Sequence, residues 1–280
     1  MPDILPYAVV SAGYAALTLH FWNTRWRAPA AEAPSGRAPG LSAPERAALA
    51  AVLALHGWLL YADLLLAPEL HFGFAPALSI TLWLGVAIYW VESLFLHLDG
   101  FEPLILPLAA LVVPLPAAFP GRAVIQHAGN PELLLHIAFG MLASGVLIIA
   151  ILHVALMVFL ERQLHRPGSA ALKQLTAFPP LLTLERLLFR MIAVAFGLFT
   201  LTLGVGIAFS ESIYGRAFRF DHKTLFSVLA WITLAILLFG RHAWGWRGRT
   251  ALRWVMAGFL FVMLAYVGKS LVLEVILGRG

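Results

Sequence analysis

The chain alternates between long apolar segments and short polar loops, and this alternation predicts its class. A helix needs about 20 mostly apolar residues to cross the hydrocarbon core of a bilayer. Segments of that kind recur along all 280 residues, and we place them at 4–24, 47–66, 75–97, 102–119, 133–160, 186–209, 224–242 and 251–277. The pattern predicts an all-α polytopic membrane bundle of about eight transmembrane helices.

The fourth apolar segment is the least regular of these spans. It contains four prolines, namely Pro103, Pro107, Pro114 and Pro116. Proline lacks a backbone N–H and clashes with the preceding helical turn, so it breaks or kinks a helix. We therefore expect this segment to be kinked or partly re-entrant.

Composition supports the membrane assignment. Hydrophobic residues make up 61% of the chain and charged residues 12%, whereas soluble domains have about 45–50% and about 25%. Residues 1–280 should then form a single transmembrane domain, with an N-terminal four-span half at 1–130 and a C-terminal four-span half at 131–280. The chain has no cysteine, which excludes disulfides and thiolate ligands.

The loop charges predict how the helices are oriented. Lysine and arginine are more frequent in cytoplasmic loops than in outer loops. In this chain they gather in the odd-numbered loops, at Arg25, Arg27, Arg37, Arg46, Arg162, Arg166, Lys173, Arg186, Arg241, Arg247 and Arg249. Both termini should therefore lie outside, on the periplasmic face of a bacterial inner membrane. Because this bias also explains the net charge of +5, we expect no nucleic-acid partner.

Three short loops in the C-terminal half are chemically distinctive. The first runs from Pro179-Pro180 to Leu184-Glu185-Arg186, the second reads Asp221-His222-Lys223, and the third reads Gly245-Trp246-Arg247-Gly248-Arg249. In the first loop we expect Thr183 to cap the sixth helix, which would place Glu185 in its first turn. Trp244 and Trp246 are typical of an aromatic anchor at the membrane interface.

Ionisable residues inside spans are costly and usually face a bundle interior or cavity. The predicted orientation sorts them into two layers. The outer layer contains Asp63, His136, Glu211, Lys269 and Glu274, with Asp221, His222 and Lys223 in the loop above it. The inner layer contains His20, His56, Glu92, His97 and His153.

His136 and His222 are the first candidates for a ligand pair. Both belong to the outer layer, and two neutral imidazoles on opposite faces of a porphyrin can hold haem iron. His153 shares a helix with His136 but lies about 25 Å away along its axis, too far to bind the same small ligand. The structural alternatives are an interfacial histidine with no ligand and a neutralising pair of Asp63 with Lys269.

The motifs together resemble one known family. Leu135-His136-Ile137, the Pro-Pro and Leu-Glu-Arg segments, Asp221-His222-Lys223 and the Gly-Trp-Arg-Gly-Arg loop occur in an order and spacing similar to those of the cytochrome c assembly (CcsA/CcmC-like) membrane proteins. The likeness is closest to their short HemX/YpjD-like branch. It covers about half of the chain directly, from about residue 136 to 277.

The resemblance implies haem handling at the outer face of the membrane. In the larger relatives a tryptophan-rich outer segment cradles haem, outer histidines ligate its iron, and the haem passes to an apocytochrome. His136 matches an outer histidine of the family, and Asp221 and Lys223 match the Asp and Lys of a Trp-Asp-Pro-Lys-Glu-like segment. The chain departs from that segment with Phe220, His222 and Thr224, and it has no large outer domain.

We therefore expect a non-enzymatic haem-handling protein that binds haem near the outer face, with His136 and His222 as iron ligands. Asp63, Glu211, Asp221, Lys223 and Lys269 would form a supporting polar layer. The partners would be the lipid bilayer, haem, and another membrane protein or an apocytochrome. An alternative is a cofactor-free accessory subunit whose partner surface is the basic loop 241–249. A solute or ion transporter is less favoured, because the two halves show no internal repeat.

Overall fold

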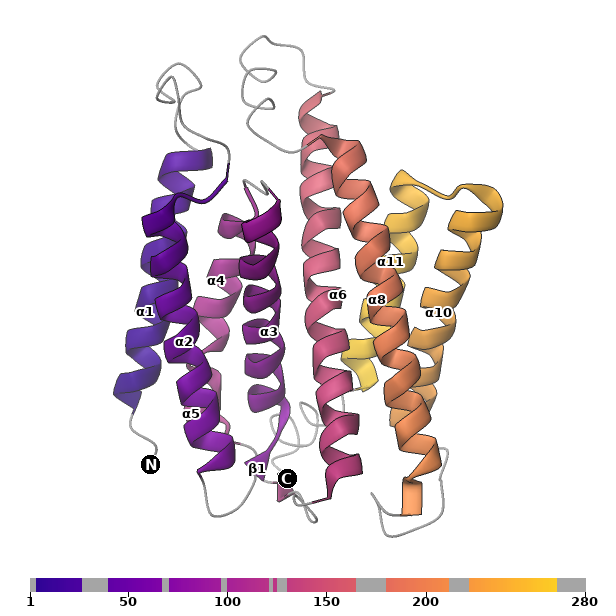
Figure 1. Cartoon of the computed structure of the whole chain (residues 1–280), viewed down its shortest axis with the longest axis horizontal. Coiled ribbons are helices and arrows are strands. Elements are labelled where there is room, and N and C mark those ends of the chain that lie inside the picture. The colour runs from indigo at the N-terminus through magenta and orange to yellow at the C-terminus, as the bar shows by residue number, and fades with distance from the viewer. Residues whose placement is uncertain are drawn as a thin grey trace.

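The computed structural model of the chain is a bundle of helices that run up and down, with α4 and α11 behind the other helices in the view of Figure 1. It describes residues 4–26, 40–66, 71–96, 100–120, 123–124, 130–164, 180–211 and 222–265. We call the end at which α6 (Pro131–Leu164) begins the outer end and the opposite end the inner end. Asp221, Lys269, Glu274 and His97 lie outside the described residues.

The N-terminal group contains α1 (Ile4–Phe21), the π-helical turn η1 (Trp22–Trp26), α2 (Ala43–Leu65) and α3 (Phe74–Phe95). Ser42 precedes α2, and the carboxylate of Glu45 accepts hydrogen bonds from the Ser42 backbone N–H and hydroxyl, both at 2.8 Å. This part of a capping box gives the backbone N–H of the N-cap residue Ser42 an acceptor. It therefore fixes where α2 begins.

The fourth apolar segment is broken, as its prolines predict. It forms α4 (Glu102–Val112), which contains Pro107, and the single turn α5 (Leu115–Ala118). Pro114 stands between them and supplies no N–H to continue the ladder. The whole stretch spans only Glu102–Ala118, shorter than the roughly 20 residues that a straight crossing needs.

The C-terminal group contains α6, α8 (Leu181–Ala208), α10 (His222–Trp244) and α11 (Gly248–Met263). Helix α6 packs along α8 and also contacts α3, which joins the two groups. At the outer end, β1 (His71–Phe72) pairs antiparallel with β2 (Ala123–Val124). This short pairing ties the α2–α3 connection to the segment that precedes α6.

The all-α membrane class is confirmed. Among the described residues, five helices are long and apolar enough to cross a membrane: Ile4–Trp26, Phe74–Phe95, Pro131–Arg162, Leu181–Ala208 and Thr224–Trp244. Helix α11 runs toward the end of the bundle at which α1 and α6 begin (Figure 1). The count of eight crossings, the outside orientation of the termini and the single-domain assignment stay predictions.

The expected cap of α8 is wrong in one detail. The helix begins at Leu181, and Pro180 is its N-cap, with φ −58° and ψ 138°. The Pro180 carbonyl accepts from the N–H groups of Thr183 and Leu184 at 2.9 and 3.1 Å. Thr183 therefore lies within the first turn, and Glu185 lies beyond it. The helix starts earlier than expected because the Pro180 carbonyl, and not the Thr183 side chain, marks its start by accepting the first helical N–H groups.

Candidate functional site

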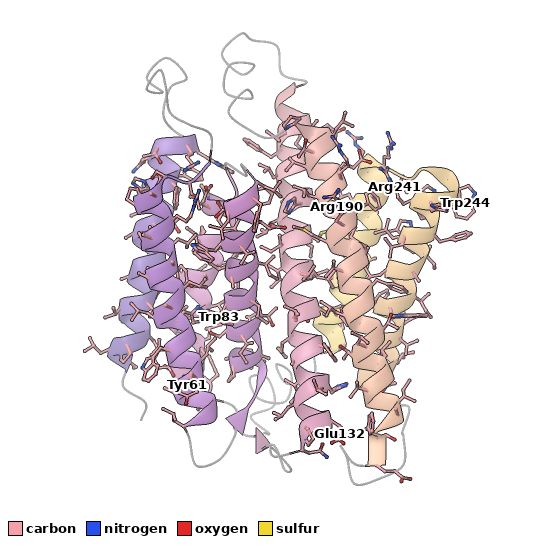
Figure 2. All side chains as sticks on the ribbon, viewed as in Figure 1. Tyr61, Trp83, Glu132, Arg190, Arg241 and Trp244 are labelled. Atoms are coloured by element: carbon pink, nitrogen blue, oxygen red, sulfur yellow. The ribbon has the colours of Figure 1, made fainter. Side chains whose placement is uncertain are left out.

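His136 lies in the outer part of α6, one turn inward from Glu132, which Figure 2 labels at the outer end of that helix. Its ring nitrogen Nδ1 is 3.0 Å from the backbone carbonyl of Thr202 on α8. A carbonyl oxygen can only accept, so Nδ1 carries the proton and Nε2 of the neutral ring carries the lone pair. The α8 contact thus fixes both the tautomer and the orientation of the ring.

The His136 ring lies close against the backbone of α8. A Cβ atom built at Gly206 would be 2.9 Å from His136 Cε1. That spacing is tighter than real Cβ contacts allow, so a side chain at 206 would displace the imidazole. Gly206 therefore provides the space in which the histidine packs.

The other predicted outer residues are distributed differently. Asp63 accepts a hydrogen bond from the hydroxyl of Tyr7 on α1, so its partner is a tyrosine. Glu211 is exposed just beyond the end of α8. His222 and Lys223 form the first turn of α10, and only their backbone is described. Among the described residues, no three His, Asp or Glu side chains lie close enough to hold a metal ion.

A second polar cluster, which the sequence did not predict, lies at the inner end of the C-terminal group. The carboxylate of Glu185 on α8 accepts a 2.6 Å hydrogen bond from Arg241 on α10 and lies 3.5 Å from Nε of Arg247. Arg241 also donates to the carbonyl of Trp246 at 3.2 Å, and its guanidinium lies 4.5 Å from the centre of the Phe189 ring. Figure 2 shows Arg241 and Trp244 at this end. We call Glu185, Arg241 and Arg247 the inner clamp.

The Gly-Trp-Arg-Gly-Arg loop is shaped to complete the inner clamp. Gly245 and Gly248 have φ of 65° and 53°, in the left-handed region that side chains disfavour. These turns fold Trp246 back onto α10, where its N–H donates to the carbonyl of Gly240 at 3.2 Å. The Trp246 ring covers Gly240 so closely that a Cβ there would clash with it, and it stacks between Trp244 and Trp254.

A third polar cluster lies at the inner end of the N-terminal group. Arg25 lies 3.1 Å from Glu45 Oε2 and 3.7 Å from Oε1 of the fully buried Glu102. Tyr89 and the N–H of Gly100 donate to Glu102 at 2.8 and 3.0 Å. Buried carboxylates are stable only when they are paired and hydrogen-bonded. This cluster therefore fixes the positions of α1, α2, α3 and α4 relative to one another.

Glu45 lies just before the predicted second span, and its ionisation is strongly favoured. Burial by itself raises the pKa of this carboxyl. Hydrogen bonds from His20 and Ser42 and the charge of Arg25 outweigh that effect and lower the pKa to about 2. Glu45 is therefore a permanently charged member of the cluster at neutral pH.

Two of the inner-layer histidines, His56 and His153, are buried in the bundle, whereas His20 is half exposed and contacts Glu45 at 3.0 Å. His56 shares hydrogen bonds with Tyr14 at 3.3 Å and Ser79 at 3.0 Å. His153 is completely buried against Phe101, with ring centres 4.3 Å apart, and its Nδ1 donates to a backbone carbonyl one turn earlier. Both residues are structural members of helix contacts.

Comparison with known proteins identifies the family. The family described as "Cytochrome C assembly protein" matches residues 46–277, which is most of the chain. The protein therefore belongs to the cytochrome c assembly family, and the resemblance seen in the sequence is confirmed. No solved structure matches.

Three relatives show how far the likeness extends. The inner membrane protein YpjD of Escherichia coli K12 is 28% identical over 174 residues, which is 62% of this chain and 64% of YpjD. An uncharacterized 28.8 kDa protein of Azospirillum brasilense is 30% identical over 89% of this chain and 94% of its own length. The cytochrome c biogenesis protein CcsA of Picosynechococcus is 30% identical over 40% of this chain and 34% of its own. The chain thus spans less than two thirds of YpjD and about one third of CcsA.

Proposed function

We propose that this protein binds haem near the outer end of the bundle, and that His136 would be a ligand of its iron. The observation that carries the proposal is the contact between His136 Nδ1 and the Thr202 carbonyl. Metal-binding histidines typically donate their second ring N–H to a carbonyl or carboxylate, which orients the ring and makes the other nitrogen a better ligand. His136 has that arrangement.

The donor chemistry of the chain fits haem better than a bare metal ion. Haem iron would be held here through the neutral imidazole nitrogen of a histidine. A protein-bound zinc ion needs three or four protein ligands, and the described residues contain no group of three His, Asp or Glu side chains. One oriented imidazole would be enough to hold haem iron.

We propose His222 as the second ligand. It is the first residue of α10, and that helix begins at the outer end, as α6 does (Figure 1). Helix α8 packs against both α6 and α10, so it connects the two histidine-bearing helices. Lys223 and Lys269 would be the cations for the propionates, and Asp63, Glu211 and Asp221 would complete the polar layer around the site.

The role that follows is binding and delivery without chemistry on the haem itself. The chain would hold haem at the outer face of a bacterial inner membrane for a partner, either an apocytochrome or another membrane protein. The name of the CcsA relative refers to cytochrome c biogenesis, which supports haem as the cargo. The protein would not be an enzyme.

The test is a hemin titration of the purified full chain in mild detergent, read by the Soret band. His136→Asn is the informative variant, because its amide can still donate to the Thr202 carbonyl but offers no imidazole to iron. We expect it to shift and weaken the Soret band. His242→Ala, at the exposed inner end of α10, is the matched control and should titrate as the native chain does.

Added imidazole separates ligation from packing. In His136→Ala, free imidazole should restore the native Soret position if the residue is an iron ligand. The proposal fails if the native chain takes up no hemin. It also fails if His136→Asn and His242→Ala titrate alike.

A further inference from the structure

A groove at the inner end of the bundle is not explained by haem handling. It opens between the end of α6 and the start of α11 and has a volume of about 460 Å³. Its lining consists of Val158, Glu161, Arg162, Arg249, Leu252 and Arg253. It lies at the opposite end of α6 from His136, so the two sites are independent.

The helical register concentrates cations on this groove. Arg249 and Arg253 are four residues apart and share one face of α11, with the apolar Leu252 beside them. On α6, Arg162 follows Val158 by the same spacing. Helix α11 thus contributes two guanidinium groups and α6 contributes one, each helix with an aliphatic side chain beside them.

The charge of the groove is positive and accessible. Its three arginines are exposed, and Glu161 is the single carboxylate in the lining. Glu161 Oε1 lies 3.8 Å from Arg249 Nε, which balances one of the three cations. The remaining excess of positive charge favours a ligand with negative charge. Guanidinium groups suit phosphate in particular, because their planar N–H pairs match two phosphate oxygens.

We propose that this groove binds the head group of an anionic phospholipid. An exposed apolar face of α11, formed by Met256, Leu260 and Leu264, continues from the groove along the bundle, and Val158 and Leu252 form the apolar lining of the groove itself. A lipid phosphate would lie on Arg249, Arg253 and Arg162 while its acyl chains extend along this face of α11. Basic pockets between helices at a membrane boundary suit anionic head groups. A free phosphate ion would use the arginines but gain nothing from the aliphatic side chains.

The experiment uses the full chain in detergent micelles, with bound lipid counted by native mass spectrometry. Phosphatidylglycerol is the anionic probe, and phosphatidylcholine is the neutral one. We expect the native chain to prefer phosphatidylglycerol. The double variant Arg249→Gln/Arg253→Gln should weaken its binding about 30-fold, corresponding to roughly 1 kcal/mol for each arginine lost. Each single substitution should weaken it about fivefold.

The chain offers a closely matched control. Arg186 and Arg190 on α8 are also exposed, four residues apart and near the inner end, but neither lines the groove. The double variant Arg186→Gln/Arg190→Gln removes the same charge and should bind phosphatidylglycerol as the native chain does. Equal losses in the two double variants would reduce the effect to net charge and overturn the proposal.

Two further results would also overturn it. The first is equal binding of phosphatidylcholine and phosphatidylglycerol by the native chain. The second is displacement of bound phosphatidylglycerol by millimolar inorganic phosphate alone, because that would make the groove a site for a free anion. The substituted arginines are exposed, so the variants leave the buried core unchanged. The single variants measure the same loss of lipid binding while one of the two arginines is kept.

Discussion

The inner clamp gives a stability prediction that can be worked out in detail. The Glu185–Arg241 contact joins side chains that are 11% and 24% exposed at a separation of 2.6 Å. A hydrogen bond to a charged group contributes about 1.5–3 kcal/mol to stability. Because Arg241 still reaches solvent, we expect a coupling energy of about 2 kcal/mol.

A double-mutant cycle isolates that energy. The variants are Glu185→Gln, Arg241→Gln and the combination, each unfolded reversibly in mixed micelles and followed by tryptophan fluorescence. The double variant should lose less stability than the sum of the two single losses, because either substitution alone already removes the interaction. Unfolding curves of the four proteins then give the coupling directly.

The Glu161–Arg249 pair is the internal control for this cycle. Its atoms are 3.8 Å apart, and the side chains are 40% and 79% exposed. Exposed ion pairs of this kind contribute about 0.2–1 kcal/mol. The reasoning is refuted if the Glu185–Arg241 coupling is below about 0.5 kcal/mol or no larger than that of the exposed pair.

Two other predictions concern the ends of helices. Gly240→Ala should destabilise the protein by about 1–3 kcal/mol, because its methyl group would clash with the Trp246 ring. Thermal unfolding measures this loss. The control is Gly197→Ala, which should show no such loss because the space around Gly197 is open. Glu45 has a folded-state pKa of about 2 against an ordinary value of 4.5. Its contribution to stability is therefore complete above pH 4.5 and is lost as the pH falls toward 2. Unfolding midpoints measured over that range should fall less steeply in Glu45→Gln, and parallel slopes would contradict the assignment.

The apolar pattern predicted the elements well for physical reasons. The thickness of the hydrocarbon core sets a minimum length for a spanning helix. The long apolar segments could therefore be identified without knowing which helices they contact. The break at Pro114 followed from its missing N–H. The depth of His136 on α6 also followed from counting residues along a helix.

The contacts between helices were not available from the same pattern. Glu185 and Arg241 are 56 residues apart. The sequence around each of them does not indicate that α8 and α10 are neighbours or that these two residues lie at the same depth. The partner of His136 is a backbone carbonyl, which every residue has and which leaves no signature in the sequence. We assigned Thr183 as the cap because of its side-chain hydroxyl. In the structure the backbone carbonyl of Pro180 accepts the N–H groups at the start of α8.

The closure of the Gly-Trp-Arg-Gly-Arg turn has a consequence for biogenesis. The bond from the Trp246 N–H to the Gly240 carbonyl and the cover that Trp246 gives to α10 both form within a few residues of chain. A hairpin of α10 and α11 can therefore form from contacts within its own turn, before it docks onto α8 through Glu185.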